Sequence, residues 1–302
     1  MHSSRPTEPV RRRRRRFDDD EPLPHRPLGP ASEVDGRTVS PDAPPEGDRW
    51  STWPSVPAGS RGPRPWPSWL VTDAGAVDHE RGVLKTGKEA DVHLVERGLP
   101  GRPGVLLAAK RYRDTDHRLF HRDAGYLEGR RVRRSRENRA MARRTAVGRE
   151  LISTRWAAAE FDALGRLHEA GASVPYPVSV ADTEVLMEFL GTPDGVAAPR
   201  LAALRPDPAA LAALWAGLAT SLGVLADLGH THGDLSAYNE LVYDARPVLI
   251  DLPQVVDVVG NPQGPSFLER DVRRIGEWFT ARGLDPDAPA ELLGELQDRV
   301  RS

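Results

Sequence analysis

The chain has 302 residues, of which 39% are hydrophobic and 28% charged, and its formal net charge is -2. This length suits one two-lobed unit or two small domains, and the near-neutral total argues against a general nucleic-acid binder. The absence of cysteine excludes disulfides, thiolate zinc sites and a cysteine nucleophile. We recognise neither an apolar segment of about 18 residues nor a secretory signal, and therefore expect a cytoplasmic protein without a membrane partner.

Residues 1–69 are predicted to form a disordered tail. They hold 14 of the chain's 28 prolines and show little apolar periodicity, so they cannot build a packed core. The basic run Arg11–Arg16 suits RNA or another polyanion, but the acidic run Asp18–Asp20 can equally neutralise it. The last part of the tail contains four tryptophans: Trp50, Trp53, Trp66 and Trp69. Exposed indoles are costly, so we expect them to dock onto the first lobe.

Residues 70–190 are predicted to form a first lobe built on antiparallel hairpins. The apolar runs Val92–Val95 and Val105–Ala109 are separated by a turn rich in glycine and proline, which indicates two paired strands. Before the first run, the loop Lys85–Asp91 has a glycine and small neighbours that would let backbone amides approach phosphates. It matches neither GxGxxG nor GxxxxGK[ST], so as an isolated segment it is more often an ordinary turn.

Lys110 and Glu160 are predicted to form an ion pair in this lobe. Lys110 ends an apolar strand and must either leave for water or point inward to an anion. Residues 151–170 are predicted to be helical, with Glu160 on the apolar stripe. Because an unpaired buried carboxylate is costly, pairing the two explains both, whereas a glutamate that reaches solvent at the stripe's edge is the alternative. In kinases such a pair positions the ATP phosphates.

Residues 111–150 are predicted to be an arginine-rich insertion between these two residues. Nine arginines fall within 130–149, which is too much charge for a core. An arm that binds RNA or docks a substrate is one interpretation, and a solvated loop is the other.

Residues 191–302 are predicted to form a second, mostly helical lobe. The strand Val185–Leu190 leads into the connector Gly191–Gly195, where free backbone groups can read an adenine edge. Asp207 is predicted to cap a helix that begins at Pro208 and runs to Leu228.

The motif HGDLSAYN, residues 232–239, is followed by Asp251 at the end of an apolar run. In this pattern Asp234 would orient a hydroxyl and accept its proton, while Asn239 and Asp251 would hold Mg²⁺. The motif therefore predicts phosphoryl transfer from ATP. The stretch after Asp251 is short, so we expect no long activation segment.

Taken in order from Val83 to Phe279, these motifs resemble the RIO family of atypical serine protein kinases, in a bacterial form. The resemblance assigns ATP binding to a loop, a lysine, its helix partner and a hinge: Thr86, Gly87, Lys88, Glu89, Ala90, Lys110, Glu160, Met187, Glu188 and Phe189. It makes Asp234 the catalytic aspartate, assisted by Lys110, and Asp251 a magnesium ligand.

The resemblance implies an α+β, two-lobed protein-kinase-like fold and an ATP- and Mg²⁺-dependent serine/threonine kinase that acts on a protein substrate or on itself. A RIO-like ATPase that phosphorylates Asp251 and works in ribosome or RNA assembly is an alternative. A small-molecule phosphotransferase of the aminoglycoside or choline type shares the HGDL-like loop, although the short second lobe argues against it. An RNA-binding scaffold that uses the arginine-rich segments ranks third.

Overall fold

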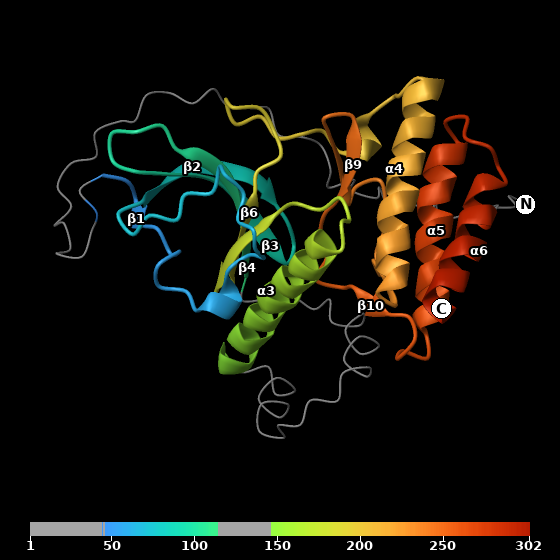
Figure 1. The fold of residues 1–302 in the computed structure, drawn as a ribbon, viewed down its shortest axis with the longest axis horizontal. Helices are drawn as coiled ribbons and strands as arrows, with labels where there is room; N and C mark the ends of the chain where they lie inside the picture. Colours follow the sequence, from blue (N-terminus) through green and yellow to red (C-terminus); the bar gives the residue numbers. More distant parts are fainter. Residues whose placement is uncertain (1–43, 45, 114–145) are drawn as a thin grey trace, which may run out of the picture. The chain divides into compact units, whose positions relative to one another are not determined.

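The computed structural model describes residue 44, residues 46–113 and residues 146–302. These residues belong to one compact unit, Asp42–Ser302, which has a six-stranded sheet with a long helix and a helical part with two small strand pairs (Figure 1). The predicted two-lobed α+β fold is confirmed. The arginine run at 11–16 and most of the predicted insertion lie outside the described residues, so contacts through them stay predictions.

The sheet is antiparallel throughout, in the order β1-β2-β3-β4-β6-β5. Its strands are β1 (Arg49–Trp50), β2 (Val77–Thr86), β3 (Ala90–Gly98), β4 (Val105–Tyr112), β5 (Pro177–Ala181) and β6 (Glu184–Glu188). The predicted hairpin is present as β3 and β4. β4 lies between β3 and β6, so the strand that carries Lys110 is an interior strand.

Alternate side chains of β4 face opposite sides of the sheet, as strand geometry requires. Leu107 and Ala109 belong to one buried cluster, while Ala108 and Tyr112 belong to the other, which includes the helices. Lys110 lies between Ala108 and Tyr112 in this alternation, so its side chain is on the same face of the sheet as theirs. Its side chain therefore points toward the helix that covers that face, and the inward alternative of the sequence prediction holds.

The segment 46–70 packs onto the sheet, although the sequence predicted disorder through residue 69. β1 pairs with the start of β2, and the ring of Trp53 is buried against that of Trp66 with 5.0 Å between centroids. The ring of Trp69 meets that of Tyr176 edge-on at 5.8 Å. The folded part therefore begins by residue 46, because the indoles supply the apolar area that the proline-rich composition obscured.

The helix α3 (Ala146–Glu169) covers the other face of the sheet and contacts β4, β5 and β6. It covers the predicted helix at 151–170 except for the last residue, and it begins five residues earlier than that range. Leu164 and Leu167 are buried, and Trp156 packs edge-on against the ring of Tyr112 with 6.0 Å between centroids. The apolar stripe predicted for this helix is therefore the face that packs on the sheet, and Glu160 lies on that face next to β4.

The helical part contains α4 (Pro208–Asp227), α5 (Gly264–Thr280) and α6 (Ala288–Arg301), with α6 packed on both others. The carboxylate of Asp207 accepts a hydrogen bond from the amide of Ala210 at 2.8 Å, which is the predicted N-cap. The small strands are β7 (His230–Thr231), β8 (Glu240–Tyr243), β9 (Arg246–Leu249) and β10 (Val256–Asp257), and the 3-10 turns are η1 (Ala58–Ser60) and η2 (Leu201–Ala203).

Within the described ranges, α4 is the one helix long and apolar enough to span a membrane by length and composition alone, with 20 residues and a mean hydropathy of 1.8. Such a segment was not predicted from the sequence, so this expectation is corrected here for α4. In the structure the leucines of α4 are buried in the core, and the helix packs against α6 and β9. This packing explains why its composition is so apolar.

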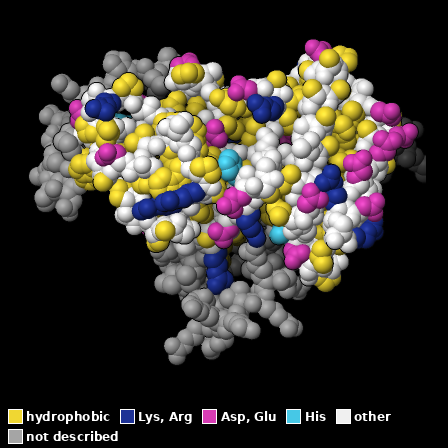
Figure 2. All heavy atoms as spheres, viewed as in Figure 1, with side chains coloured by type: hydrophobic (Ala, Val, Ile, Leu, Met, Phe, Trp, Pro, Cys, Tyr) yellow, Lys and Arg dark blue, Asp and Glu magenta, His cyan; other side chains and the backbone are white. Residues whose placement is uncertain are grey.

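Acidic and basic side chains are intermixed on the face of the molecule drawn in Figure 2. Such mixing agrees with the net charge of -2. Any selective electrostatic recognition by this face must therefore come from a few placed side chains and not from one broad field.

Candidate active site

Lys110 joins two carboxylates that are far apart in the sequence. Its Nζ lies 2.7 Å from Oε1 of Glu160 and 2.6 Å from Oδ1 of Asp251, and its side chain is 11% exposed. Burial lowers the pKa of Lys110, but the charges of Asp251 and Glu160 outweigh it and raise that pKa well above its usual value. Lys110 therefore stays a cation, and it links β4, α3 and the segment after β9.

Glu160 is buried but fully supplied with donors. Besides Lys110, its carboxylate accepts the hydroxyl of Tyr112 at 2.6 Å on Oε2 and the amide of Leu252 at 3.2 Å on Oε1. Burial, followed by the charge of Glu160, raises the pKa of Tyr112 well above its usual value, so this hydroxyl stays a donor. The sequence analysis missed Tyr112, although it stands two residues after Lys110 on the same strand face.

Asp251 follows β9 with a left-handed φ of 66°. The charge of Lys110 holds the pKa of Asp251 below its usual value despite burial of the carboxyl group, so it is ionised. Its side chain is 49% exposed, and the next residue, Leu252, is buried in the core. Leu252 is thus fixed in the core, and the left-handed backbone of Asp251 directs its carboxylate toward Lys110. A non-glycine residue with this backbone conformation is uncommon and often marks a functional position.

The loop after β7 is held by Asp271 of α5. The buried carboxylate of Asp271 accepts the amides of Gly233 at 2.6 Å and Leu235 at 3.1 Å and the hydroxyl of Thr231 at 2.9 Å. Gly233 has a φ of 86°, and a Cβ there would lie 2.2 Å from the carbonyl oxygen of Gln254, so only glycine fits. The loop that carries Asp234 is therefore rigidly attached to α5.

Asn239 is placed between Asp234 and the segment of Asp251. The side-chain Nδ2 of Asn239 donates to the backbone carbonyl of Asp234 at 2.9 Å. The backbone carbonyl of Asn239 accepts the amide of Ile250 at 3.0 Å. The first bond uses the amide nitrogen and leaves Oδ1 as a possible metal ligand. With the carboxylate of Asp251, it forms the oxygen-rich donor set that Mg²⁺ prefers. Among the described residues, no group of three or more His, Cys, Asp or Glu side chains could hold a metal. Asp251 and Asn239 alone would leave the other positions of an octahedral Mg²⁺ to oxygens of water or of a substrate.

Glu240, directly after Asn239, is a buried residue that the sequence analysis did not single out. Its side chain is fully buried in β8, and neither carboxylate oxygen has a hydrogen-bond partner among the described residues. Burial raises the pKa of Glu240 to about 8. Glu160 and Glu240 are equally buried. Glu160 accepts hydrogen bonds from three donors, whereas the carboxylate of Glu240 accepts none from the described residues.

The predicted ATP loop and hinge lie on the sheet that carries Lys110. Residues 86–90 connect β2 to β3, and the amide of Gly87 donates to the carbonyl of Ala90 at 3.0 Å. Met187 and Glu188 end β6, and the carboxylate of Glu188 accepts the amide of Tyr176 at 3.1 Å. The Glu188 side chain is therefore engaged in the sheet. Phe189 follows the strand.

Known proteins are similar to this chain over much of its length. A family model described as the RIO domain matches residues 110–291. The chain belongs to the RIO family. The RIO-type serine/threonine-protein kinase Rio1 of Haloferax volcanii is 33% identical over 221 residues, which cover 72% of this chain and 69% of that protein. The serine/threonine-protein kinase RIO1 of Chaetomium thermophilum is 30% identical over 213 residues, which cover 68% of this chain and 40% of that protein.

The RIO kinase fold is also present in solved structures. The Rio2 kinase of Chaetomium thermophilum, in an ADP/Mg²⁺-phosphoaspartate complex, has a TM-score of 0.50 and 22% identity over 74% of this chain and 71% of that one. At that identity the likeness concerns the fold. The chain spans only 39% and 40% of the length of two fungal Rio1 relatives. The RIO domain match begins at Lys110, so the loop at 86–90 lies before it.

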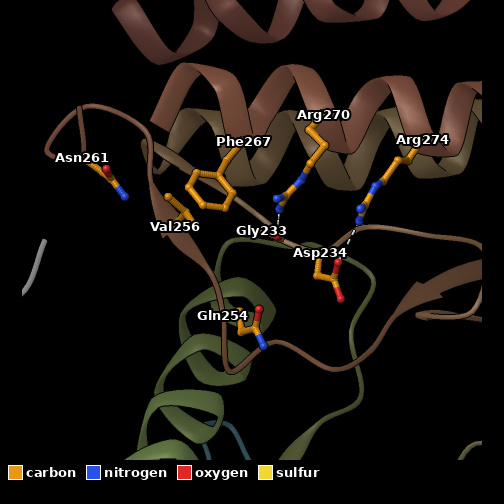
Figure 3. A pocket seen from close by; sticks show the side chains of 8 residues that line it. All are labelled: Gly233, Asp234, Gln254, Val256, Asn261, Phe267, Arg270 and Arg274. Carbon is orange, nitrogen blue, oxygen red and sulfur yellow. Dashed lines mark hydrogen bonds and ion pairs between the residues drawn. The ribbon is translucent and has the colours of Figure 1, made fainter. Parts of the chain in front are cut away.

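A pocket opens on Asp234 in this RIO domain. It is lined by Gly233, Asp234, Gln254, Val256, Asn261, Phe267, Arg270 and Arg274. Figure 3 shows the side chains of Arg270 and Arg274 reaching from α5 to the loop. Nη1 of Arg274 lies 2.9 Å from Oδ1 of Asp234, and both side chains are more than a third exposed. The sequence analysis named neither arginine.

Proposed function

We propose that this RIO kinase domain transfers the γ-phosphoryl group of ATP, with Mg²⁺, to a serine or threonine hydroxyl of a protein, its own chain included. One observation carries the proposal: Lys110 bridges Glu160 and Asp251, residues 50 and 141 positions away. A lysine held by a helix glutamate beside a metal-binding aspartate is the arrangement that protein kinases use on ATP phosphates. The serine/threonine kinase names of its relatives support the same activity.

The residues present fit a bound Mg²⁺-nucleotide. Asp251 and Asn239 would hold the metal, and Lys110 would contact the phosphates. Bound Mg²⁺ would neutralise charge on the phosphates. Because Lys110 stays cationic and Asp251 stays ionised, both side chains have the charge that these roles require.

Asp234 is proposed as the residue that receives the acceptor. Its carboxylate would orient the serine hydroxyl and take the proton as the hydroxyl oxygen bonds to the γ-phosphorus. The bond between that phosphorus and the β–γ bridging oxygen breaks, and ADP leaves with its electron pair. Asn239 supports this geometry through its 2.9 Å hydrogen bond to the Asp234 carbonyl.

Asp251 offers a second candidate acceptor, because its side chain is about half exposed while its Oδ1 is held by Lys110. In this reaction a carboxylate oxygen of Asp251 would bond to the γ-phosphorus, and ADP would leave. Water would then hydrolyse the acyl phosphate and regenerate the carboxylate, so that the net reaction is ATP hydrolysis. Such an ATPase cycle is the alternative implied by the RIO resemblance.

Incubation of the full chain with Mg²⁺ and γ-labelled ATP separates the two reactions. Acid-stable serine or threonine label that disappears in Asp234→Ala supports the protein kinase. Acid-labile label with free phosphate, lost in Asp251→Asn, supports the ATPase cycle. Neither label nor free phosphate above the level of both variants would refute the proposal.

A further inference from the structure

The pocket at Asp234 contains two arginines that phosphoryl transfer does not itself require. Phe267, Arg270 and Arg274 follow one another at i, i+3 and i+7 of α5, so they lie on one face of the helix. Figure 3 shows this face directed at the catalytic loop. The residues that line the pocket include Asp234 but none of the Lys110 cluster. The pocket therefore lies where an acceptor, and not the nucleotide, would approach Asp234.

Arg270 is held in a fixed position. One of its terminal nitrogens donates to the carbonyl of Gly233, and its guanidinium stacks on the ring of Phe267 at 4.5 Å from the centroid. Its Nε has no hydrogen-bond partner among the described residues. Since Asp271 also ties α5 to the loop, this guanidinium is preorganised next to the position of the acceptor.

Among the described residues, the ion pair with Asp234 is the one hydrogen bond or salt bridge of the Arg274 side chain. An ion pair this exposed contributes little to stability and exchanges partners readily. A guanidinium has five N–H donors, so Arg274 can hold a second anion or leave Asp234 for it. While it remains on Asp234, it occupies Oδ1, one of the two carboxylate oxygens.

We propose that Arg270 and Arg274 form an anion subsite that selects acceptor serines lying next to acidic side chains. The planar fork of arginine matches the two oxygens of a carboxylate. An acceptor carboxylate that binds Arg274 draws it from Asp234 and frees that carboxylate for the hydroxyl. The inference rests on the proposed kinase activity and names its substrate class: an acidic peptide segment.

Peptide binding tests the subsite without requiring catalysis. Two labelled peptides, a serine flanked by glutamates and the same peptide with glutamines, are titrated with the full chain by fluorescence anisotropy. The acidic peptide is expected to bind about tenfold more tightly. Arg274→Gln is expected to remove the preference, and Arg274→Lys, which keeps the charge but loses the fork, to retain part of it.

Arg273→Gln is the matched control. Arg273 lies on the same helix, pairs with Glu277 at 3.1 Å and does not line the pocket. The substitution removes the same charge, so the acidic preference should persist. All other arginines of the chain are identical in these variants, so their general attraction for acidic peptides cancels in the comparison. Thermal unfolding confirms that each variant is folded.

Three results would overturn the subsite: no acidic preference in the unsubstituted chain, a preference that survives Arg274→Gln, or an equal loss in Arg273→Gln. Single-stranded RNA that binds with the same dependence on Arg274 would overturn the peptide assignment in favour of phosphate. Transfer of label to the same peptides separates the two proposals. An Arg274-dependent binding preference with no transfer of label to the peptides or to the chain itself supports the subsite and refutes the kinase activity.

Discussion

The two ends of the candidate active site are built in different ways. At the Lys110 end, the lysine is largely buried and Glu160 is fully buried, and the glutamate accepts three hydrogen bonds, from Lys110 and Tyr112 of β4 and from the amide of Leu252. At the Asp234 end, Asp234 and Arg274 are partly exposed and have one charged partner each. Buried ion pairs persist only when every charge is satisfied, whereas exposed pairs exchange easily. The proposed nucleotide end is therefore held in place, whereas the proposed acceptor end can adjust.

Loss of the proposed base should give the largest effect on activity and almost none on stability. Asp234→Asn keeps the shape but cannot accept the proton, so we expect transfer to fall by about 10²- to 10⁴-fold. Because this side chain is partly exposed, unfolding in urea should change by less than about 0.5 kcal/mol. Labelled transfer and urea titration measure both quantities. Unchanged transfer would remove Asp234 from the mechanism.

Loss of the buried cation should damage both activity and stability. Lys110→Met leaves the carboxylate of Glu160 buried without its counter-ion, at a cost of about 3–5 kcal/mol in unfolding free energy. The double variant Lys110→Met/Glu160→Gln removes both charges and should recover part of that loss. Urea unfolding of both variants provides the test. A double variant less stable than Lys110→Met would contradict the pairing argument.

Glu240 is a buried carboxylate of the opposite kind to Glu160. Neither of its carboxylate oxygens has a hydrogen-bond partner in the described part of the chain. Its pKa is about 8 when folded, against 4.5 normally, so between these values the folded chain keeps a proton that the unfolded chain has lost. Stability should therefore fall as pH rises through this window. Glu240→Gln should be more stable than the parent by about 4–5 kcal/mol at pH 8.5, with a much smaller difference at pH 4.5.

Urea unfolding at the two pH values measures this difference. Glu295→Gln, an exposed position on α6, is the control and should show no comparable pH dependence. Equal gains for Glu240→Gln at both pH values would show that the carboxyl group does not carry the effect.

The smallest effect is expected at Tyr112. Tyr112→Phe keeps the ring in the core but removes the 2.6 Å hydrogen bond to Glu160, which should cost about 1.5–3 kcal/mol in stability. With Glu160 less firmly held, Lys110 is positioned less well, and kcat/KM should fall about tenfold. Steady-state kinetics should show a fall in kcat larger than any rise in KM. A stability loss with unchanged kinetics would limit Tyr112 to a packing role.

The sequence predicted the parts of the site that have a local signal. Lys110 at the end of an apolar strand and Glu160 on an apolar stripe each looked out of place, and each explained the other. Asp271 gives the same signal, since it lies between Leu268 and Ile275 on the buried stripe of α5, and it was missed. Arg274 has no such signal, because an exposed arginine on a helix is ordinary until the fold brings Asp234 to it.

The boundary at residue 69 could not be predicted from composition, because proline content obscured a few well-placed indoles. This has a practical consequence. A shortened chain that begins at residue 70 would lose β1, which pairs with Val77 and Asp78 at the outer edge of β2, and it would uncover Leu107 and Tyr176 on the outer face of the sheet. Open strand edges and apolar sheet faces promote aggregation. Insolubility of such a fragment would therefore reflect loss of the segment 46–69 from the face of the sheet, and not low stability of the rest of the kinase fold.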